Sequence, residues 1–322
     1  MKMSAMLGQL PGMARPALLV AACCLVGTWW TAPSASVASP PGAAPPARRK
    51  LGFLGVGTMN SAIVRGLCKP SEAAAGKPAG TPWVEFPLYL SPRGAAKAAA
   101  LARELGPGMV TVCASNEELL DLADVVVVGL TPPVARDVLP RLRFRSEQLV
   151  LSLMSTITNA QLESLLGFPD GSARKAIPLP PVAKHRGVTV VCPPDTFVSG
   201  IFRQLGTVVE VSKEEQLQAF LAATSSMGPF YQQVVTLQRW LAEQGIADAE
   251  AAAFAGALYG SISADSAAPS SGADLAALVS EQTPGGLNEE AVRRLSTAGV
   301  YDSQRAALDA ILLRIRKAAG AG

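Results

Sequence analysis

The chain contains one histidine, His185, among its 322 residues. A single imidazole excludes metal centres built from several histidines, and it leaves serine-triad chemistry dependent on that one residue. No GxSxG motif accompanies it, so a serine hydrolase is not indicated. Because Lys184 and Arg186 flank His185, we expect an exposed basic loop there, with a functional switch as the alternative.

Aromatic residues are also scarce, at 5% of the sequence, and the net charge is only +3. Both features argue against nucleic-acid binding. Two of the five cysteines lie in an N-terminal apolar run, and Cys68, Cys113 and Cys192 are scattered without a CxxC motif. This pattern favours neither a disulfide framework nor a metal site. The sequence is nevertheless 49% hydrophobic, which is enough for a buried core.

Residues 1–48 resemble a targeting leader. Lys2 and Arg15 precede an apolar run over residues 16–30, and an acid-free stretch rich in Ser, Ala and Pro then reaches Arg48. A signal-like part followed by a transit-like part favours a plastid, with the mitochondrion, the cytoplasm, the secretory route and a retained anchor as alternatives. Because the run is short for a membrane span, we expect no stable membrane association once the leader is removed.

Residues 49–212 alternate predicted strands with predicted helices. Val125–Leu130 is an unbroken apolar run, as in strands buried on both faces. The alternation predicts an α/β fold with a doubly wound, mostly parallel sheet. The predicted strands are 51–54, 83–90, 110–113, 125–130, 149–153 and 188–191, the predicted helices are 60–68, 94–105 and 116–122, and 69–82 is a predicted loop insertion.

Residues 213–322 form a predicted all-helical part. Its helices are rich in Ala and Leu, so each buries little area, and such a part often completes its core against a second copy. We therefore expect a homodimer or a higher homo-oligomer. The predicted helices are 214–224, 229–244, 248–264, 275–280, 287–298 and 302–319.

The first strand runs into a glycine turn and then into a helix. Gly55 permits the sharp turn, and Gly57 lets the backbone approach a pyrophosphate, which the positive end of the next helix attracts. The third glycine of the usual fingerprint falls at Asn60. The order of strand, turn and helix favours a dinucleotide site over a purely structural turn.

The end of the second strand indicates which dinucleotide binds. Sites selective for NADH place Asp or Glu there, whereas this chain has Ser91 and Arg93. An arginine pairs with a phosphate through two hydrogen bonds. The sequence therefore favours NADPH, with NADH and an ordinary solvated Arg93 as the alternatives.

Six motifs occur in the order found in pyrroline-5-carboxylate reductases: GFLGVGTMNSAI, SPR, ASNEELLDLADVVVVGLTPP, LVLSLMSTITNAQLESLLG, SSMGPFY and TPGG. From residue 50 to the C-terminus the chain resembles that family. The resemblance implies a Rossmann domain followed by a helical dimerisation domain in a homo-oligomer. It also implies reduction of the cyclic imine 1-pyrroline-5-carboxylate to proline, in proline biosynthesis, with NAD(P)H.

The resemblance also implies which residues form the site. No residue is implied as an acid–base catalyst, because aligning the hydride with the imine suffices. The implied cofactor contacts are Leu54, Gly55, Val56, Gly57, Thr58 and Met59 at the pyrophosphate, Ser91 and Arg93 at the 2′-phosphate, Asn116 near the adenine ribose, Gly129, Leu130, Thr131 and Pro132 where the family has Ala-Val-Lys-Pro, and Met154 and Ser155 near the nicotinamide. The implied substrate contacts are Thr283, Gly285, Gly286, Leu287 and Asn288.

The chain departs from the family around the substrate. Leu287 and Asn288 replace a small residue and Thr, and residues 177–181 read IPLPP in place of MPNTP. The implied pocket is bulkier and less polar, although Asn288 and the N–H groups of Gly285 and Gly286 remain candidates for holding a carboxylate. A related reductase with another imine substrate and a non-catalytic NADP-binding dimer are therefore the alternatives.

Overall fold

The computed structural model describes residues 47–69, 82–267 and 271–320. Nearly all of the predicted leader and most of the predicted insertion at 69–82 lie outside these ranges, so both stay predictions. Among the helices of the described ranges, none combines the length and apolar character needed to cross a membrane.

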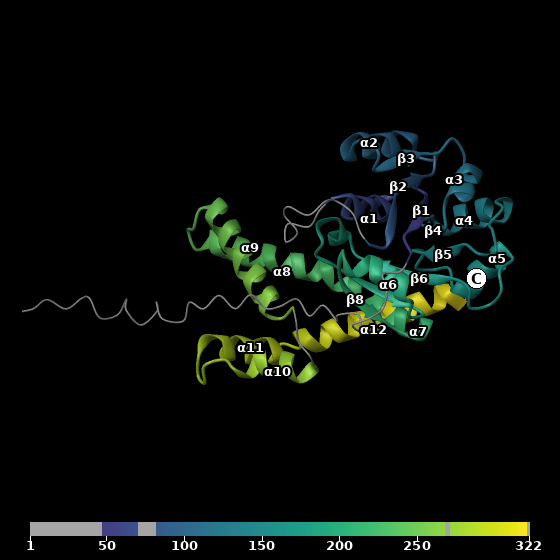
Figure 1. The fold of residues 1–322 in the computed structure, drawn as a ribbon. Coiled ribbons are helices and arrows are strands. Elements are labelled where there is room, and N and C mark those ends of the chain that lie inside the picture. The colour runs from purple at the N-terminus through teal and green to yellow at the C-terminus, as the bar shows by residue number, and fades with distance from the viewer. Residues whose placement is uncertain (1–46, 70–81, 268–270, 321–322) are drawn as a thin grey trace, which may run out of the picture.

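An eight-stranded sheet forms the first part of the chain, in the order β3-β2-β1-β4-β5-β6-β7-β8 (Figure 1). Neighbouring strands are parallel except β6 and β7, so β7 and β8 run opposite to the rest. The predicted doubly wound, mostly parallel sheet is thus confirmed. The strands are β1 (Arg49–Leu54), β2 (Val84–Leu90), β3 (Val110–Val112), β4 (Val125–Val128), β5 (Leu149–Ser152), β6 (Arg174–Pro178), β7 (Gly187–Cys192) and β8 (Gly206–Glu210).

Helices cover both faces of the sheet. Because side chains alternate along a strand, Val125 and Val127 of β4 pack into the core layer with α1, α2 and α6, whereas Val126 and Val128 pack with α3, α4 and α5. These helices are α1 (Thr58–Cys68), α2 (Ala95–Leu105), α3 (Asn116–Leu122), α4 (Pro132–Val138), α5 (Asn159–Leu166) and α6 (Thr196–Arg203), with short 3₁₀ turns η2 (Leu139–Arg141) and η3 (Pro180–Lys184).

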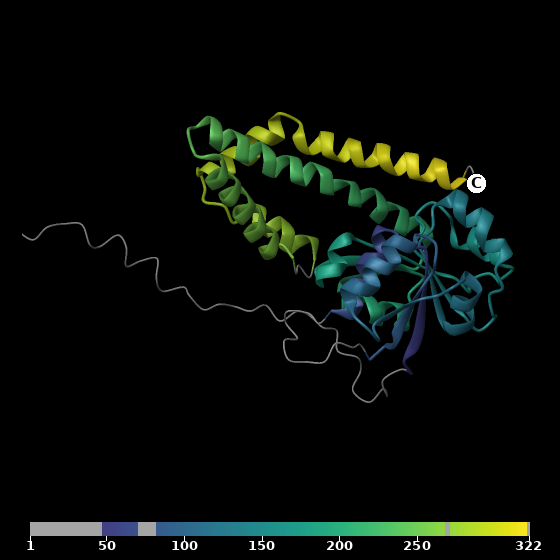
Figure 2. The ribbon, with the colours of Figure 1, turned by 90° about the horizontal axis from the view of Figure 1, so that it is seen from above.

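The rest of the chain is helical. The last strand ends at Glu210 and the next helix begins at Glu214, while the domain boundary at 212/213 stays a prediction. Helices α8 and α9 extend away from the sheet, and α12 returns to pack against α7 (Figures 1 and 2). The elements are α7 (Glu214–Ala223), η4 (Thr224–Ser226), α8 (Met227–Glu243), α9 (Asp248–Asp265), α10 (Gly272–Ser280), α11 (Leu287–Thr297) and α12 (Val300–Gly320).

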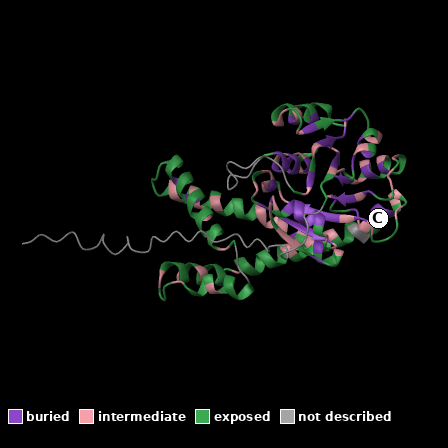
Figure 3. Ribbon diagram, viewed as in Figure 1, coloured by how far each residue is buried: buried purple, intermediate pink, exposed green. Residues whose placement is uncertain are grey.

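Burial is concentrated in the sheet half (Figure 3). Helix α9 buries only Ala251 and Ala255, and α8 buries no side chain. Apolar side chains instead face outward, which is typical of a surface that binds another protein. The exposed ones on α8, α9 and α10 include Phe230, Tyr231, Trp240, Phe254, Leu258, Ile262, Leu275, Leu278 and Val279.

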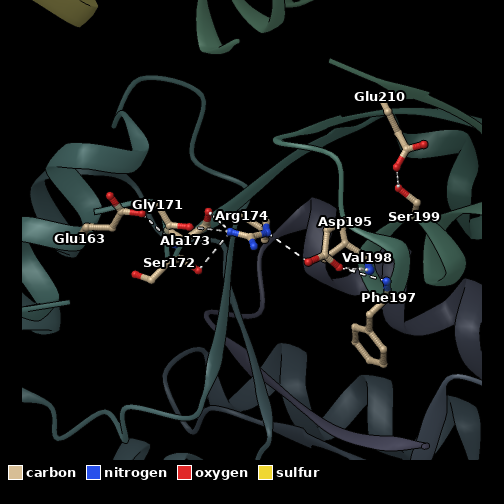
Figure 4. A network of polar contacts seen from close by, with 10 residues as sticks. All are labelled: Glu163, Gly171, Ser172, Ala173, Arg174, Asp195, Phe197, Val198, Ser199 and Glu210. Atoms are coloured by element: carbon tan, nitrogen blue, oxygen red, sulfur yellow. Dashed lines mark hydrogen bonds and ion pairs between the residues drawn. The ribbon is translucent and has the colours of Figure 1, made fainter. Parts of the chain in front are cut away.

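A polar network holds the start of β6 in place (Figure 4). Arg174 Nε lies 3.0 Å from an oxygen of Asp195, whose other oxygen accepts from two backbone N–H groups in the first turn of α6. Glu163 of α5, 2% exposed, accepts from the backbone N–H of Ala173 at 2.7 Å. Two helices that flank β6 are thus fastened to the beginning of that strand.

Lys184 and Arg186 are exposed as expected, whereas His185 between them is not. It is half-buried, with Nδ1 2.7 Å from the carbonyl oxygen of Gln204 and Nε2 3.0 Å from that of Lys69. Carbonyl oxygens only accept, and which ring nitrogen donates depends on the tautomer. His185 therefore joins the end of α1 to the end of α6.

Candidate functional site

A cleft of about 600 Å³ opens at the carboxyl ends of β1 and β4, where the strand order reverses. Nucleotides bind at such switch points in open α/β sheets. None of the described residues that line this cleft carries a carboxylate. Its lining residues are Gly55, Val56, Gly57, Arg93, Gly94, Ala95, Ala96, Lys97, Gly129, Leu130, Thr131 and Val134.

Two glycines shape the loop between β1 and α1. Gly55 has a φ of +86°, and a Cβ there would lie 2.9 Å from the Gly129 carbonyl oxygen. Gly57 precedes α1, and a Cβ on it would meet no atom within 4 Å, so the loop is open on that side. The N–H groups of Val56 and Gly57 have no acceptor within the described ranges. Free N–H groups at a helix start fit a pyrophosphate.

Ser91 lies beneath this loop. It is 1% exposed, and its Oγ accepts from the Gly55 N–H at 3.1 Å. Ser91 is predicted to lie beside Arg93 at a 2′-phosphate, whereas in the structure its oxygen holds the loop. This role follows from the contact of Ser91 Oγ with the loop backbone, which the sequence does not indicate.

Arg93 and Lys97 flank the start of α2 in the cleft. Both are exposed, and neither has an ion-pair partner in the described parts of the chain. The first turn of α2 carries no acidic residue, so its positive end adds to these two charges. A phosphate group fits a place with these positive charges. Lys97 was missed from the sequence, although a lysine in the first turn of a helix is a signal of a nearby anion.

The other predicted cofactor residues lie near the carboxyl edge of the sheet. Pro132 begins α4 and Asn116 begins α3, where the Asn116 Oδ1 is buried without a partner in the described structure. Met154 is 4% exposed and donates its N–H to Ser152 Oγ at 3.2 Å, whereas Ser155 is exposed. Among the remaining predicted residues, Leu54 is 1% exposed in the core, and Thr58 and Met59 form the first turn of α1 instead of preceding it.

The predicted substrate residues Thr283–Asn288 form the turn between α10 and α11. Gly285 has a φ of +73°, and its N–H donates to a Glu289 oxygen at 2.5 Å. The N–H of Gly286 donates to the Thr283 carbonyl oxygen at 2.9 Å, and Asn288 Nδ2 donates to Gln282 at 2.7 Å. In the single chain these three donors are thus bonded within the turn, and their role in holding a carboxylate stays a prediction.

A single chain does not bring the two predicted sites together. The turn between α10 and α11 lies well away from α1 and β1 in both ribbon views (Figures 1 and 2). The cleft is lined by the sheet half alone. Leu287, 86% exposed, shows how open the turn is in one chain.

Comparison with known proteins gives sequence matches over part of the chain. A family model described as NADP oxidoreductase, coenzyme F420-dependent, matches residues 50–156. The pyrroline-5-carboxylate reductase of Escherichia coli (strain K12) is 29% identical over 187 residues, covering 55% of this chain and 64% of that protein. In this match the chain thus spans slightly less than two thirds of its relative.

Solved structures share the fold over a longer range. A pyrroline-5-carboxylate reductase from Coxiella burnetii has a TM-score of 0.68 at 23% identity, covering 84% of this chain and 99% of that one. The pyrroline carboxylate reductase of Plasmodium falciparum, solved with NADP bound, has a TM-score of 0.63 at 19% identity, covering 84% and 98%. The solved structures thus share the fold of this chain, and the curated match with the ordered motifs makes the chain similar to pyrroline-5-carboxylate reductases.

Proposed function

We propose that the protein is an NADPH-dependent reductase of carbon–nitrogen double bonds and that its substrate is 1-pyrroline-5-carboxylate, reduced to proline. The observation that carries this proposal is the cleft at the ends of β1 and β4, in a chain similar to pyrroline-5-carboxylate reductases. The cleft has an open glycine loop and two cations, Arg93 and Lys97, without an ion-pair partner among the described residues. The backbone N–H groups of Val56 and Gly57 hold the pyrophosphate, and Arg93 with Lys97 holds the 2′-phosphate.

The chemistry suits a cleft without carboxylates. When bound, the cofactor supplies a hydride. A protonated cyclic imine already has an electrophilic carbon, so the protein mainly has to align it. Reduction removes the positive charge of the imine, so a nearby carboxylate would stabilise the substrate more than the transition state.

We also propose that the active protein is a homodimer in which the partner's turn between α10 and α11 completes the substrate pocket. The exposed apolar side chains of α8, α9 and α10 support this assembly. The separation of the turn from the cleft in one chain supports it as well (Figure 1). The substrate carboxylate then competes with Glu289 for the Gly285 N–H.

A second candidate is a reductase of the same chemistry with another imine substrate. Leu287 and Asn288, together with the internally bonded N–H groups of the turn, favour this alternative. A less polar pocket fits an imine that carries an acid group other than a ring carboxylate, or an imine that carries no acid group.

The test is NADPH oxidation by the full chain with a panel of cyclic and open imines, with and without a carboxylate. We expect oxidation with 1-pyrroline-5-carboxylate and proline as the product. Turnover only with other imines would establish the second candidate. If the protein binds NADPH but none of the imines causes its oxidation, both candidates are contradicted and a non-catalytic NADP-binding dimer is left.

A further inference from the structure

Asn60 stands where the usual fingerprint has its third glycine, and it is 2% exposed. Its Nδ2 donates to the carbonyl oxygen of Gly55 at 2.5 Å and to that of Leu54 at 3.3 Å. The same Leu54 oxygen accepts from the N–H of Gly129 at 3.0 Å. The carboxamide thus ties the first turn of α1 to the exits of β1 and β4.

Gly129 provides the space for this carboxamide. A Cβ at position 129 would lie 2.6 Å from Asn60 Nδ2 and 2.9 Å from Asn60 Cγ. Gly129 is not among the glycines with positive φ, so crowding by Asn60, and not backbone conformation, is what requires glycine there. The side chain of Asn60 can yield only by losing its two hydrogen bonds. The usual fingerprint has glycine at the position of Asn60, and the family that the chain resembles has alanine at the position of Gly129.

The contact with Asn60 sets the direction of the peptide group between Gly55 and Val56. This peptide is trans, so its carbonyl oxygen and its N–H point in opposite directions. Because Asn60 holds the Gly55 oxygen on the protein side, the N–H of Val56 points the other way, and Val56 lines the cleft. The Asn60 Oδ1 is buried with no partner in the described ranges, which costs stability. The part of the Asn60 side chain that makes contacts is therefore its Nδ2 donor.

We propose that Asn60 is a positioning residue for the dinucleotide, which aims the Val56 N–H at the pyrophosphate, and that Gly129 is the matching change that makes room for it. This inference rests on the proposed NADPH binding. It explains how this chain binds a dinucleotide without the third glycine of the fingerprint. It predicts that positions 60 and 129 are coupled in nucleotide affinity.

The test compares the full-length protein with Asn60→Asp, Asn60→Gly, Gly129→Ala and the double variant Asn60→Gly/Gly129→Ala. Asp keeps the shape but turns the donor into an acceptor facing two carbonyl oxygens, so we expect the Kd for NADPH to rise about tenfold or more. Asn60→Gly and Gly129→Ala should each weaken binding by about tenfold. The double variant should bind no more weakly than Asn60→Gly, because a methyl group at position 129 then has no carboxamide to displace.

Two further readouts separate positioning from mere stability. Thermal unfolding without nucleotide shows whether each variant folds. The Val56 amide resonance should shift on adding NADP⁺ in the wild type, and much less in Asn60→Gly and in the double variant, which both lack the carboxamide. Single effects that simply add in the double variant would overturn the coupling. A wild type that does not bind NADPH would instead remove the proposed function, in the first titration.

Discussion

Lys175 of β6 and Glu214 at the start of α7 form an ion pair in which Lys175 is 1% exposed and Glu214 is 23% exposed. The Lys175 ammonium also donates to the Ile157 carbonyl oxygen, and the Glu214 carboxylate accepts from the Asn159 N–H at 3.1 Å. Burial lowers the pKa of Lys175, and the charge of Glu214 opposes that shift. The pair thus joins the sheet, the start of α5 and the helical half.

Replacing Lys175 with Met should lower the free energy of unfolding by about 3 kcal/mol, because it leaves Glu214 without its counter-charge in a largely buried place. Urea unfolding measures the change. The matched control is Lys50→Met, which removes an exposed pair with Glu85 at 3.8 Å and should cost less than about 1 kcal/mol. Equal losses in both variants would mean that burial of the Lys175 pair is unimportant.

Replacing Arg93 or Lys97 with Ala should raise the Michaelis constant for NADPH by about tenfold, and that for NADH much less. Only NADPH carries the 2′-phosphate that these two cations are placed to hold. Because both side chains are exposed, added salt should reduce the difference between the two nucleotides. Steady-state kinetics with both nucleotides measures the effect.

Arg103→Ala is the control for charge alone, because Arg103 is an exposed cation in the last turn of the same helix and does not line the cleft. It should leave both Michaelis constants unchanged. If Arg93→Ala affects NADPH and NADH equally, the 2′-phosphate is held elsewhere.

Gly57→Ala should leave the stability of the protein nearly unchanged and weaken NADPH binding by at least about tenfold. Gly57 has a φ of −81° and a ψ of −177°, which alanine adopts readily, and its Cβ would point into open space. The added methyl group instead occupies the place of the pyrophosphate. Thermal unfolding and NADPH titration check the two halves of this prediction, and undiminished affinity would contradict it.

Two buried thiols should make the fold less stable at alkaline pH. Burial raises the pKa of Cys68 from 9.0 to about 12 and that of Cys113 from 9.0 to about 11. The unfolded chain therefore loses these protons first, so their contribution is fully present below pH 9.0 and is lost as the pH rises toward about 11 and 12.

Urea unfolding as a function of pH measures this loss for the wild type and for Cys68→Ala. The variant should be less stable at neutral pH because of its cavity, but its stability should fall less steeply above pH 9.0. Identical slopes would show that the Cys68 thiol ionises as easily in the fold as in the unfolded chain.

Features set by local pattern could be predicted from the sequence. The valine run of β4 and the glycine turn after β1 indicate their own structure, because burial on both faces needs apolar residues and a sharp turn needs glycine. β6 was not predicted, since its sequence RKAIP contains Lys175, which is buried only because Glu214 reaches it from another part of the chain.

The unpredicted parts of the candidate site depend on contacts between distant segments. Ser91 supports the loop through Gly55, 36 positions away, and nothing in SPR alone indicates this. Lys97 reaches the cleft because α2 begins beside it. The Gly285 N–H donates to Glu289, which lies outside the TPGG motif, so the motif alone does not indicate this hydrogen bond.

Because burial is uneven along the chain, local opening should differ between the sheet and the C-terminal helices. Amide protons of β4, whose four valines are all buried, exchange with solvent only when the whole sheet opens. Those of α8 and α9 have few buried side chains to hold them, so another molecule packed on these helices would supply much of their protection. Dilution should then speed exchange in α8 and α9 and leave β4 untouched.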